Sequence, residues 1–180
     1  MSGYESGIFT SMEVDETQLD NVVTSYTFNT IGEHTVKYGL YDETKLGNQA
    51  PTFYNDNLVE CIIPNSVISI GNAVFTNCIG LINIDIPSGV TSIGASAFGG
   101  CSGLTSCTIG SGVTSIGQYA FNQCSSLTSV TVNATIPPTL GLDVFTNTND
   151  CPIYVPSGSV ETYKSTGNWN TYASRIQAIP

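Results

Sequence analysis

Ile-Pro-Ser-Gly-Val-Thr-Ser-Ile-Gly, residues 86–94, is the middle copy of a sequence that occurs three times in this chain. Residues 63–71 read Ile-Pro-Asn-Ser-Val-Ile-Ser-Ile-Gly, and residues 109–117 read Ile-Gly-Ser-Gly-Val-Thr-Ser-Ile-Gly. The copies are about 23 residues apart. A fixed period between about 20 and 50 residues is typical of proteins built from stacked repeats.

The second half of each unit repeats with the same period. It places a phenylalanine, a cysteine and a leucine at fixed phase: Phe75, Phe98 and Phe121, then Cys78, Cys101 and Cys124, then Leu81, Leu104 and Leu127. A single coil of this length cannot bury these side chains alone. Stacking at about 4.8 Å, the spacing of neighbouring strands, places identical residues over one another. The apolar columns then form one continuous core.

The full pattern is Ile-Pro-x-x-Val-x-x-Ile-Gly-x-x-Ala-Phe-x-x-Cys-x-x-Leu-x-x-Ile. It resembles the BspA-like class of bacterial leucine-rich repeats, closely over residues 63–131 and in degraded form over about 40–154. The resemblance implies a right-handed solenoid. It also implies a surface or secreted protein that binds other proteins or host matrix, since most members of the class are of that kind.

We therefore predict a repeat solenoid, mainly β with short helical turns, closed by a β-hairpin cap at the N-terminus and a helical cap at the C-terminus. The predicted divisions are an acidic leader (1–22), the hairpin (23–41), a solenoid of about five coils (42–154) and the C-terminal cap (155–180). The leader is interpreted as irregular and flexible. The alternative is a segment that packs on a partner or on a neighbouring copy.

Local patterns add detail to this prediction. Residues 24–41 alternate apolar and polar side chains around a Gly32-Glu33 turn, which is typical of a hairpin. Residues 81–86 predict a strand of each repeat, and residues 97–101 predict one or two helical turns. Pro137 and Pro138 cannot donate to a ladder, so one side of the sheet is expected to end there.

The C-terminal segment carries a different pattern. A helix is expected from Ser157 to Lys164, with Ser157 or Ser159 as the N-cap. A second short helical piece should follow and place Trp169, the one tryptophan, over the last coil.

Charge excludes two classes of partner. The chain of 180 residues has 4 basic and 14 acidic residues and a formal charge of −10. Nucleic acids and anionic membranes both require clustered Lys or Arg, so neither is expected as a partner. The sequence has no apolar run long enough to insert into a membrane and no signal peptide in its first residues. We expect either a trimmed piece of an exported protein or another route to the outside, such as release of a virion by lysis.

All six cysteines fall where other copies place an apolar residue, which favours buried reduced thiols over disulfides. Catalysis would depend on His34, the one histidine, beside the predicted hairpin turn. Calcium at Asp143, Asn147, Asn149 and Asp150 is a minor alternative, because their spacing fits no known loop well. The sequence therefore predicts no enzyme, no cofactor and no metal.

The outward positions of the predicted strands form the candidate binding face. It consists of Glu60, Ile82, Asn83, Asp85, Thr105, Thr108, Thr128, Thr131 and Tyr154. One hypothesis is a non-enzymatic adhesion module, extracellular or on the cell surface, that contacts protein or glycan through this face. The alternative is a structural or receptor-binding component of a phage virion, attached, or self-associated, through residues 1–22.

Overall fold

The computed structural model describes residues 9–14, 17–19, 36–40, 45–46 and 61–180. The chain divides into two compact units, Met1–Glu43 and Thr44–Pro180. The second unit contains the repeats and the candidate binding face.

The first unit contains one antiparallel sheet of order β2-β1-β3, made of β1 (Phe9–Val14), β2 (Thr17–Leu19) and β3 (Val36–Leu40). The prediction of an irregular leader over residues 1–22 is therefore wrong for β1 and β2. The sequence of β1 alternates only at its end, where Met12 and Val14 flank Glu13, and this short pattern lies in an acidic segment. β3, the second half of the hairpin predicted at residues 24–41, pairs with β1 in the structure. Residues 20–35, including His34, lie outside the described residues.

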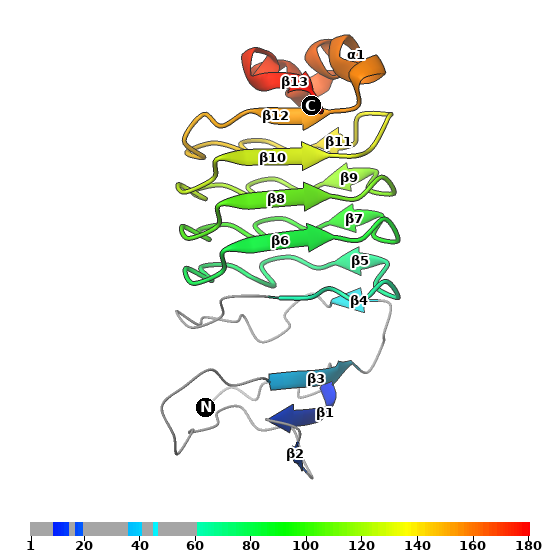
Figure 1. The fold of residues 1–180 in the computed structure, drawn as a ribbon, viewed down its shortest axis with the longest axis vertical. Helices are drawn as coiled ribbons and strands as arrows, with labels where there is room; N and C mark the ends of the chain where they lie inside the picture. Colours follow the sequence, from blue (N-terminus) through cyan, green and yellow to red (C-terminus); the bar gives the residue numbers. More distant parts are fainter. Residues whose placement is uncertain (1–8, 15–16, 20–35, 41–44, 47–60) are drawn as a thin grey trace. The chain divides into compact units, whose positions relative to one another are not determined.

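The second unit is a stack of coils with a parallel sheet on each of two sides (Figure 1). The first sheet has the order β13-β12-β10-β8-β6, with β6 (Asn83–Ile86), β8 (Ser106–Ile109), β10 (Ser129–Val132), β12 (Ile153–Val155) and β13 (Ile176–Ala178). The second has the order β11-β9-β7-β5-β4, with β4 (Lys45–Leu46), β5 (Ser69–Ile70), β7 (Ser92–Ile93), β9 (Ser115–Ile116) and β11 (Thr139–Leu140). This is the predicted mainly-β solenoid.

The register of the parallel strands follows the 23-residue period of the sequence. Ile84 pairs with Cys107, and Cys107 pairs with Val130, so that equivalent residues of successive copies lie side by side. Burial alternates along each strand: Ile84 and Ile86 are buried, whereas Asn83 and Asp85 are exposed. The strand period of two therefore sends one set of columns into the core and the other to the surface.

The phenylalanine column forms the centre of the core. Phe75, Phe98, Phe121 and Phe145 stack in order, with ring centroids 5.1, 5.1 and 5.6 Å apart and planes within 12° of parallel. All four rings are at most 1% exposed. This confirms the predicted continuous column, and it shows that Phe145 keeps its place although the fourth unit departs from the pattern.

The predicted helical turns at residues 97–101 are absent. The structure has hydrogen-bonded turns there, because each coil contains two residues with positive φ, four positions apart. These pairs are Ala73 and Asn77, Ser96 and Gly100, Tyr119 and Gln123, and Asp143 and Asn147. A left-handed residue at every fourth position interrupts the run of right-handed conformations that a helix requires.

The glycine of each Ile-Gly pair marks a close approach between coils. A Cβ atom on Gly117 would lie 2.5 Å from the backbone nitrogen of Ala95 and 2.6 Å from the carbonyl carbon of Gly94. Gly94 and Gly141 have equivalent contacts with the preceding coil. The position therefore excludes a side chain because backbone, which cannot rotate away, fills the space.

We expect Gly117→Ala to lower the free energy of unfolding by about 1–3 kcal/mol, because the added methyl group forces adjacent coils apart. Urea denaturation followed by circular dichroism measures the change. Gly158→Ala is the matched control, since a Cβ there meets nothing within 4 Å. Equal stability of the two variants would contradict the assignment of Gly117 as a packing contact.

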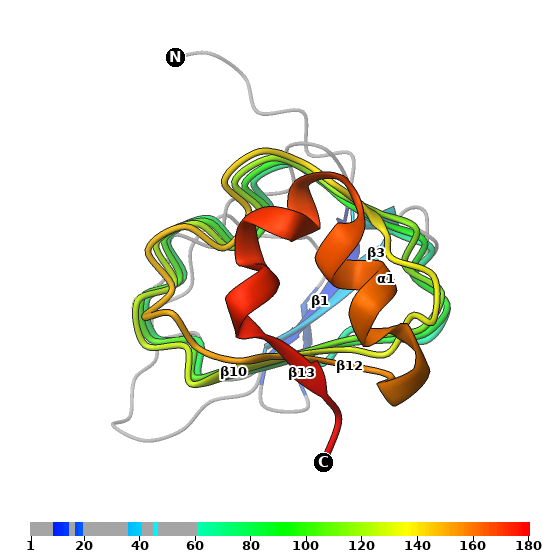
Figure 2. The same cartoon turned by 90° about the horizontal axis from the view of Figure 1, so that it is seen from above.

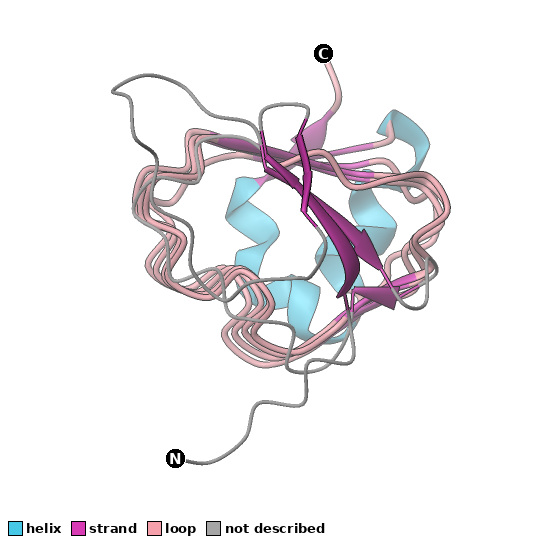
Figure 3. Ribbon diagram, turned by 90° about the horizontal axis from the view of Figure 1, so that it is seen from below, coloured by secondary structure: helices cyan, strands magenta, loops and turns pink. Residues whose placement is uncertain are grey.

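The C-terminal cap lies across the end of the stack (Figures 2 and 3). It consists of a 3-10 turn (Ser157–Ser159), α1 (Val160–Ser165), a 3-10 helix (Gly167–Arg175) and β13. Trp169 is 1% exposed and packs on Phe145, with centroids 6.0 Å apart. Its indole N–H donates to the carbonyl of Pro138 at 2.7 Å. The helical cap and the covering role of Trp169 are confirmed.

The cap also protects the free edge of the second sheet. β11 is the last strand of that sheet, directly after the two prolines, as predicted. The side-chain amide of Asn168 donates to the carbonyls of Leu140 and Gly141. Side chains thereby satisfy acceptors that a further strand would otherwise take.

Two features of the cap differ from prediction. β13 continues the first sheet, with Ile176 beside Ile153, an offset of 23 residues that the sequence already contained. The cap is therefore a modified repeat coil in which helix replaces the second strand. Ser159 occupies the N-cap of α1, but its hydroxyl donates to the carbonyl of Thr135 and makes no cap hydrogen bond.

The cysteines carry free thiols. The thiols of Cys101 and Cys124 donate to the carbonyls of Phe75 and Phe98 in the preceding coil, at 3.0 and 3.1 Å. The hydrogen bond with Cys124, together with burial, raises the pKa of Cys101 to about 12. Burial raises the pKa of Cys61 to about 11. Both thiols are thus protonated at neutral pH and are poor nucleophiles.

Candidate binding face

Three columns of exposed or half-buried side chains run across the outer face of the first sheet, whose strands β6, β8, β10 and β12 lie side by side in Figure 1. The first column contains Ile82, Thr105 and Thr128; the second contains Asn83, Ser106 and Ser129; the third contains Asp85, Thr108, Thr131, Tyr154 and Gln177. Eight of the nine predicted residues thus share one face, which we call the outer face. Glu60 lies outside the described residues.

Some polar side chains of the outer face form hydrogen bonds to the neighbouring coil. The hydroxyls of Thr105 and Thr128 each donate to a carbonyl in the preceding coil, those of Ile82 and Thr105, both at 3.0 Å. Thr105 and Ser106 also donate to Oδ1 of Asn83, at 3.1 and 2.6 Å. The first column therefore stabilises the stack, and its hydroxyls are less available to a ligand than those of a free threonine side chain.

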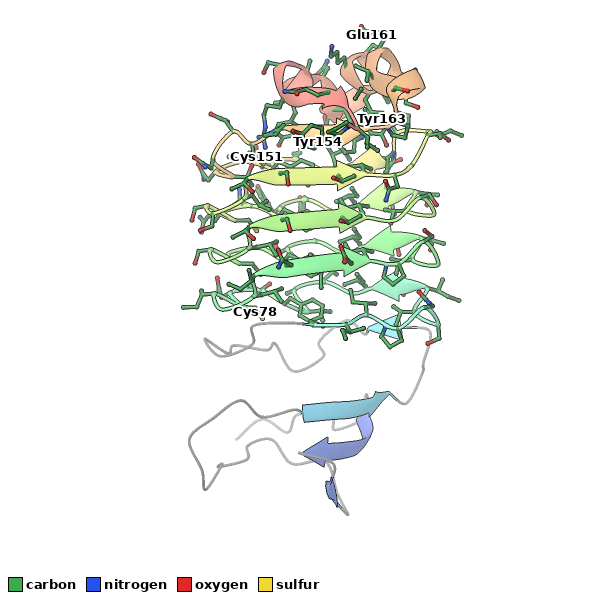
Figure 4. All side chains as sticks on the ribbon, in the orientation of Figure 1. Cys78, Cys151, Tyr154, Glu161 and Tyr163 are labelled. Atoms are coloured by element: carbon green, nitrogen blue, oxygen red, sulfur yellow. The ribbon has the colours of Figure 1, made fainter. Side chains whose placement is uncertain are left out.

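The third column is different. Within the described residues, the hydroxyls of Thr108 and Thr131 have no hydrogen-bond partner. Tyr154, labelled in Figure 4, is half-buried on β12 and lies beside Gln177 of β13. The column thus presents hydroxyl groups and one aromatic ring at successive strand spacings of about 4.8 Å.

Asp85 is the one charged residue between residues 61 and 142. In the described part of the chain the ion pairs join Lys164 to Glu161 and Arg175 to Asp150, and none includes Asp85. The middle of the outer face is consequently neutral, and its single charge lies at the β6 end.

An open hollow of about 610 Å³ adjoins that charge. It is lined by Cys61, Ile62, Ile63, Asn65, Ile82, Asn83, Asp85, Ile86 and Pro87. Ile62 is 82% exposed, yet sequence reasoning omitted it from the face. Its distance of 23 residues from Asp85, one repeat period, was the signal that could have identified it.

A second groove, of about 650 Å³, lies between the last coil and the cap. Arg175 lines this groove, but its guanidinium group is already used in hydrogen bonds within the chain. It donates to the carbonyls of Cys151 and Phe145 at 2.8 and 3.2 Å, and to the hydroxyl of Thr148 at 2.9 Å. Arg175 therefore fastens the cap to the last coil.

The four residues considered for calcium all have positive φ: Asp143, Asn147, Asn149 and Asp150. Asn and Asp adopt this conformation more readily than most residues, so the backbone conformation by itself explains why these residue types occur here. The described residues contain no group of three or more His, Cys, Asp or Glu that could hold a metal. Nor does any helix among them have the length and apolar character to cross a membrane.

Comparison with protein families agrees with this architecture. A family model described as BspA type leucine rich repeat region matches residues 44–170 with 6 copies, one more than the predicted count of about five coils. No curated protein matches. One similar solved structure is a leucine-rich repeat protein from Bacteroides ovatus ATCC 8483, 17% identical, with a TM-score of 0.26, covering 79% of this chain and 72% of that chain.

Proposed function

Since this chain belongs to the BspA-type leucine-rich repeat family, we propose that it is a non-enzymatic adhesion module whose outer face binds protein or glycan outside a cell. Repeats of this kind are general protein-binding modules and are typically not enzymes. BspA-type repeats usually occur in surface-associated bacterial proteins. These family properties support a binding function, and the side chains of the outer face support that face as the binding surface.

The third column is the observation that carries the proposal. Each coil adds one outward side chain at the equivalent position of its strand, so the column presents a regular row of groups over five strands. The hydroxyls of Thr108 and Thr131 are not used within the described residues. A rigid row of unused donors and acceptors binds without a large ordering cost, because the sheet already fixes each side chain.

The double substitution Thr108→Arg with Thr131→Arg tests this face. The wild-type chain and the variant are applied to a glycan array and to immobilised purified extracellular-matrix proteins. We expect binding to at least one of these probes, and a loss of about tenfold or more in affinity for the variant, since two bulky charges at the centre of an interface disrupt its packing.

The matched control adds the same two charges elsewhere, by Gln118→Arg with Thr139→Arg. Both of these side chains are exposed, and neither lies in the three columns. Binding of the control should equal that of the wild type. Failure of the wild-type chain to bind any probe, or an equal loss in both variants, would argue against the outer face.

A further inference from the structure

We infer that the hollow beside Asp85 takes a lysine or arginine side chain from a protein partner, which makes that partner a basic peptide segment and not a neutral glycan. The inference rests on the proposed function and names the chemistry of its partner. It is carried by the shape, lining and charge of the hollow.

The hollow offers separate surfaces to the two parts of a basic side chain. Ile62 and Ile82 are both exposed, at 82% and 39%, and both line the hollow with apolar surface. Asp85 supplies a carboxylate to the same lining. Lys and Arg have an apolar stem and a charged head, and they commonly bury the stem against apolar surface while the head is paired.

Charge complementarity favours the same occupant. Asp85 has no ion-pair partner in the described part of the chain, so a cationic head would be its first. The chain as a whole carries a formal charge of −10, which raises the rate of encounter with basic segments at low ionic strength.

Asn83 adds an observation that points to a peptide. Its Oδ1 accepts from Thr105 and Ser106, which fixes the amide with its oxygen toward β8. Within the described residues the amide nitrogen has no hydrogen-bond partner. The hollow therefore combines an acceptor for a cationic head with a donor suited to a main-chain carbonyl, and a basic residue in a peptide supplies both.

The test selects peptides against the full chain. A library of short randomised peptides displayed on yeast is selected for binding to the wild-type chain, with counter-selection on Asp85→Asn. We expect the selected peptides to contain Arg or Lys beside aliphatic residues. Titration should show about fivefold weaker binding to Asp85→Asn, the effect of losing one solvent-accessible ion pair.

A double-mutant cycle separates the pair from general charge effects. Citrulline, a neutral isostere of Arg, should weaken binding of a selected peptide to the wild type by the same factor and leave binding to Asp85→Asn unchanged. Asp143→Asn makes the same change in net charge at an exposed site away from the hollow and should bind like the wild type.

Three outcomes would overturn the inference: no enrichment of Arg or Lys, an equal loss in Asp143→Asn, or independent effects of citrulline and Asp85→Asn. Each leaves the broader proposal to be decided by the Thr108 and Thr131 variant. If that variant loses binding to a glycan probe while Asp85→Asn retains it, the outer face functions and the basic-peptide assignment is wrong.

Discussion

Trp169→Ala is expected to lower the free energy of unfolding by about 3–5 kcal/mol. The indole is 1% exposed and covers Phe145 at the end of the phenylalanine column. It also contacts Tyr163, with centroids 4.9 Å apart and the rings nearly perpendicular. Its removal leaves a large cavity and deprives the carbonyl of Pro138 of its indole donor.

Urea denaturation of the full chain measures this change, and light scattering reports whether the opened end self-associates. A solenoid without its cap exposes core and strand edge, so we expect Trp169→Ala to form higher oligomers. Trp169→Phe keeps most of the packing but loses part of the ring and the N–H donor, so it should cost about 1–3 kcal/mol. Wild-type stability of Trp169→Ala would show that the cap does not close the stack.

Phe121→Ala should cost a similar amount, about 3–5 kcal/mol, at the middle of the stack. Phe121 is fully buried between Phe98 and Phe145, with centroids 5.1 and 5.6 Å away. Flanking coils fix both neighbours, so the site has little room to collapse. The cavity therefore stays largely open, and both ring contacts are lost.

Tyr119→Ala is the control for Phe121→Ala. Tyr119 lies two residues earlier in the same turn, but its side chain is 41% exposed. Its removal should change the free energy of unfolding by less than about 1 kcal/mol. The slope of the denaturation curve adds a second readout, because a stack uncoupled at its centre unfolds in two steps with a shallower apparent transition. Equal losses in the two variants would contradict the column as the main source of stability.

The composition of the outer face was largely predictable, because strand period and repeat period together determine which side chains share a surface. Asp85, Thr108 and Thr131 are 23 residues apart, and the register places them side by side. The sequence could not show that Thr105 and Thr128 spend their hydroxyls on carbonyls of the preceding coil. These hydrogen bonds depend on the distance between successive coils, which is set only when the coils stack.

The sequence by itself determined the solenoid and its columns, because a period of 23 residues holds Phe, Cys and Leu at fixed phase and stacking buries them together. The position of Trp169 after the last repeat indicated its covering role. Only the tertiary structure decided the left-handed turns in place of helix at residues 97–101 and the pairing of β3 with β1. These features depend on contacts between residues far apart in the chain, and local propensity carries little information about such contacts.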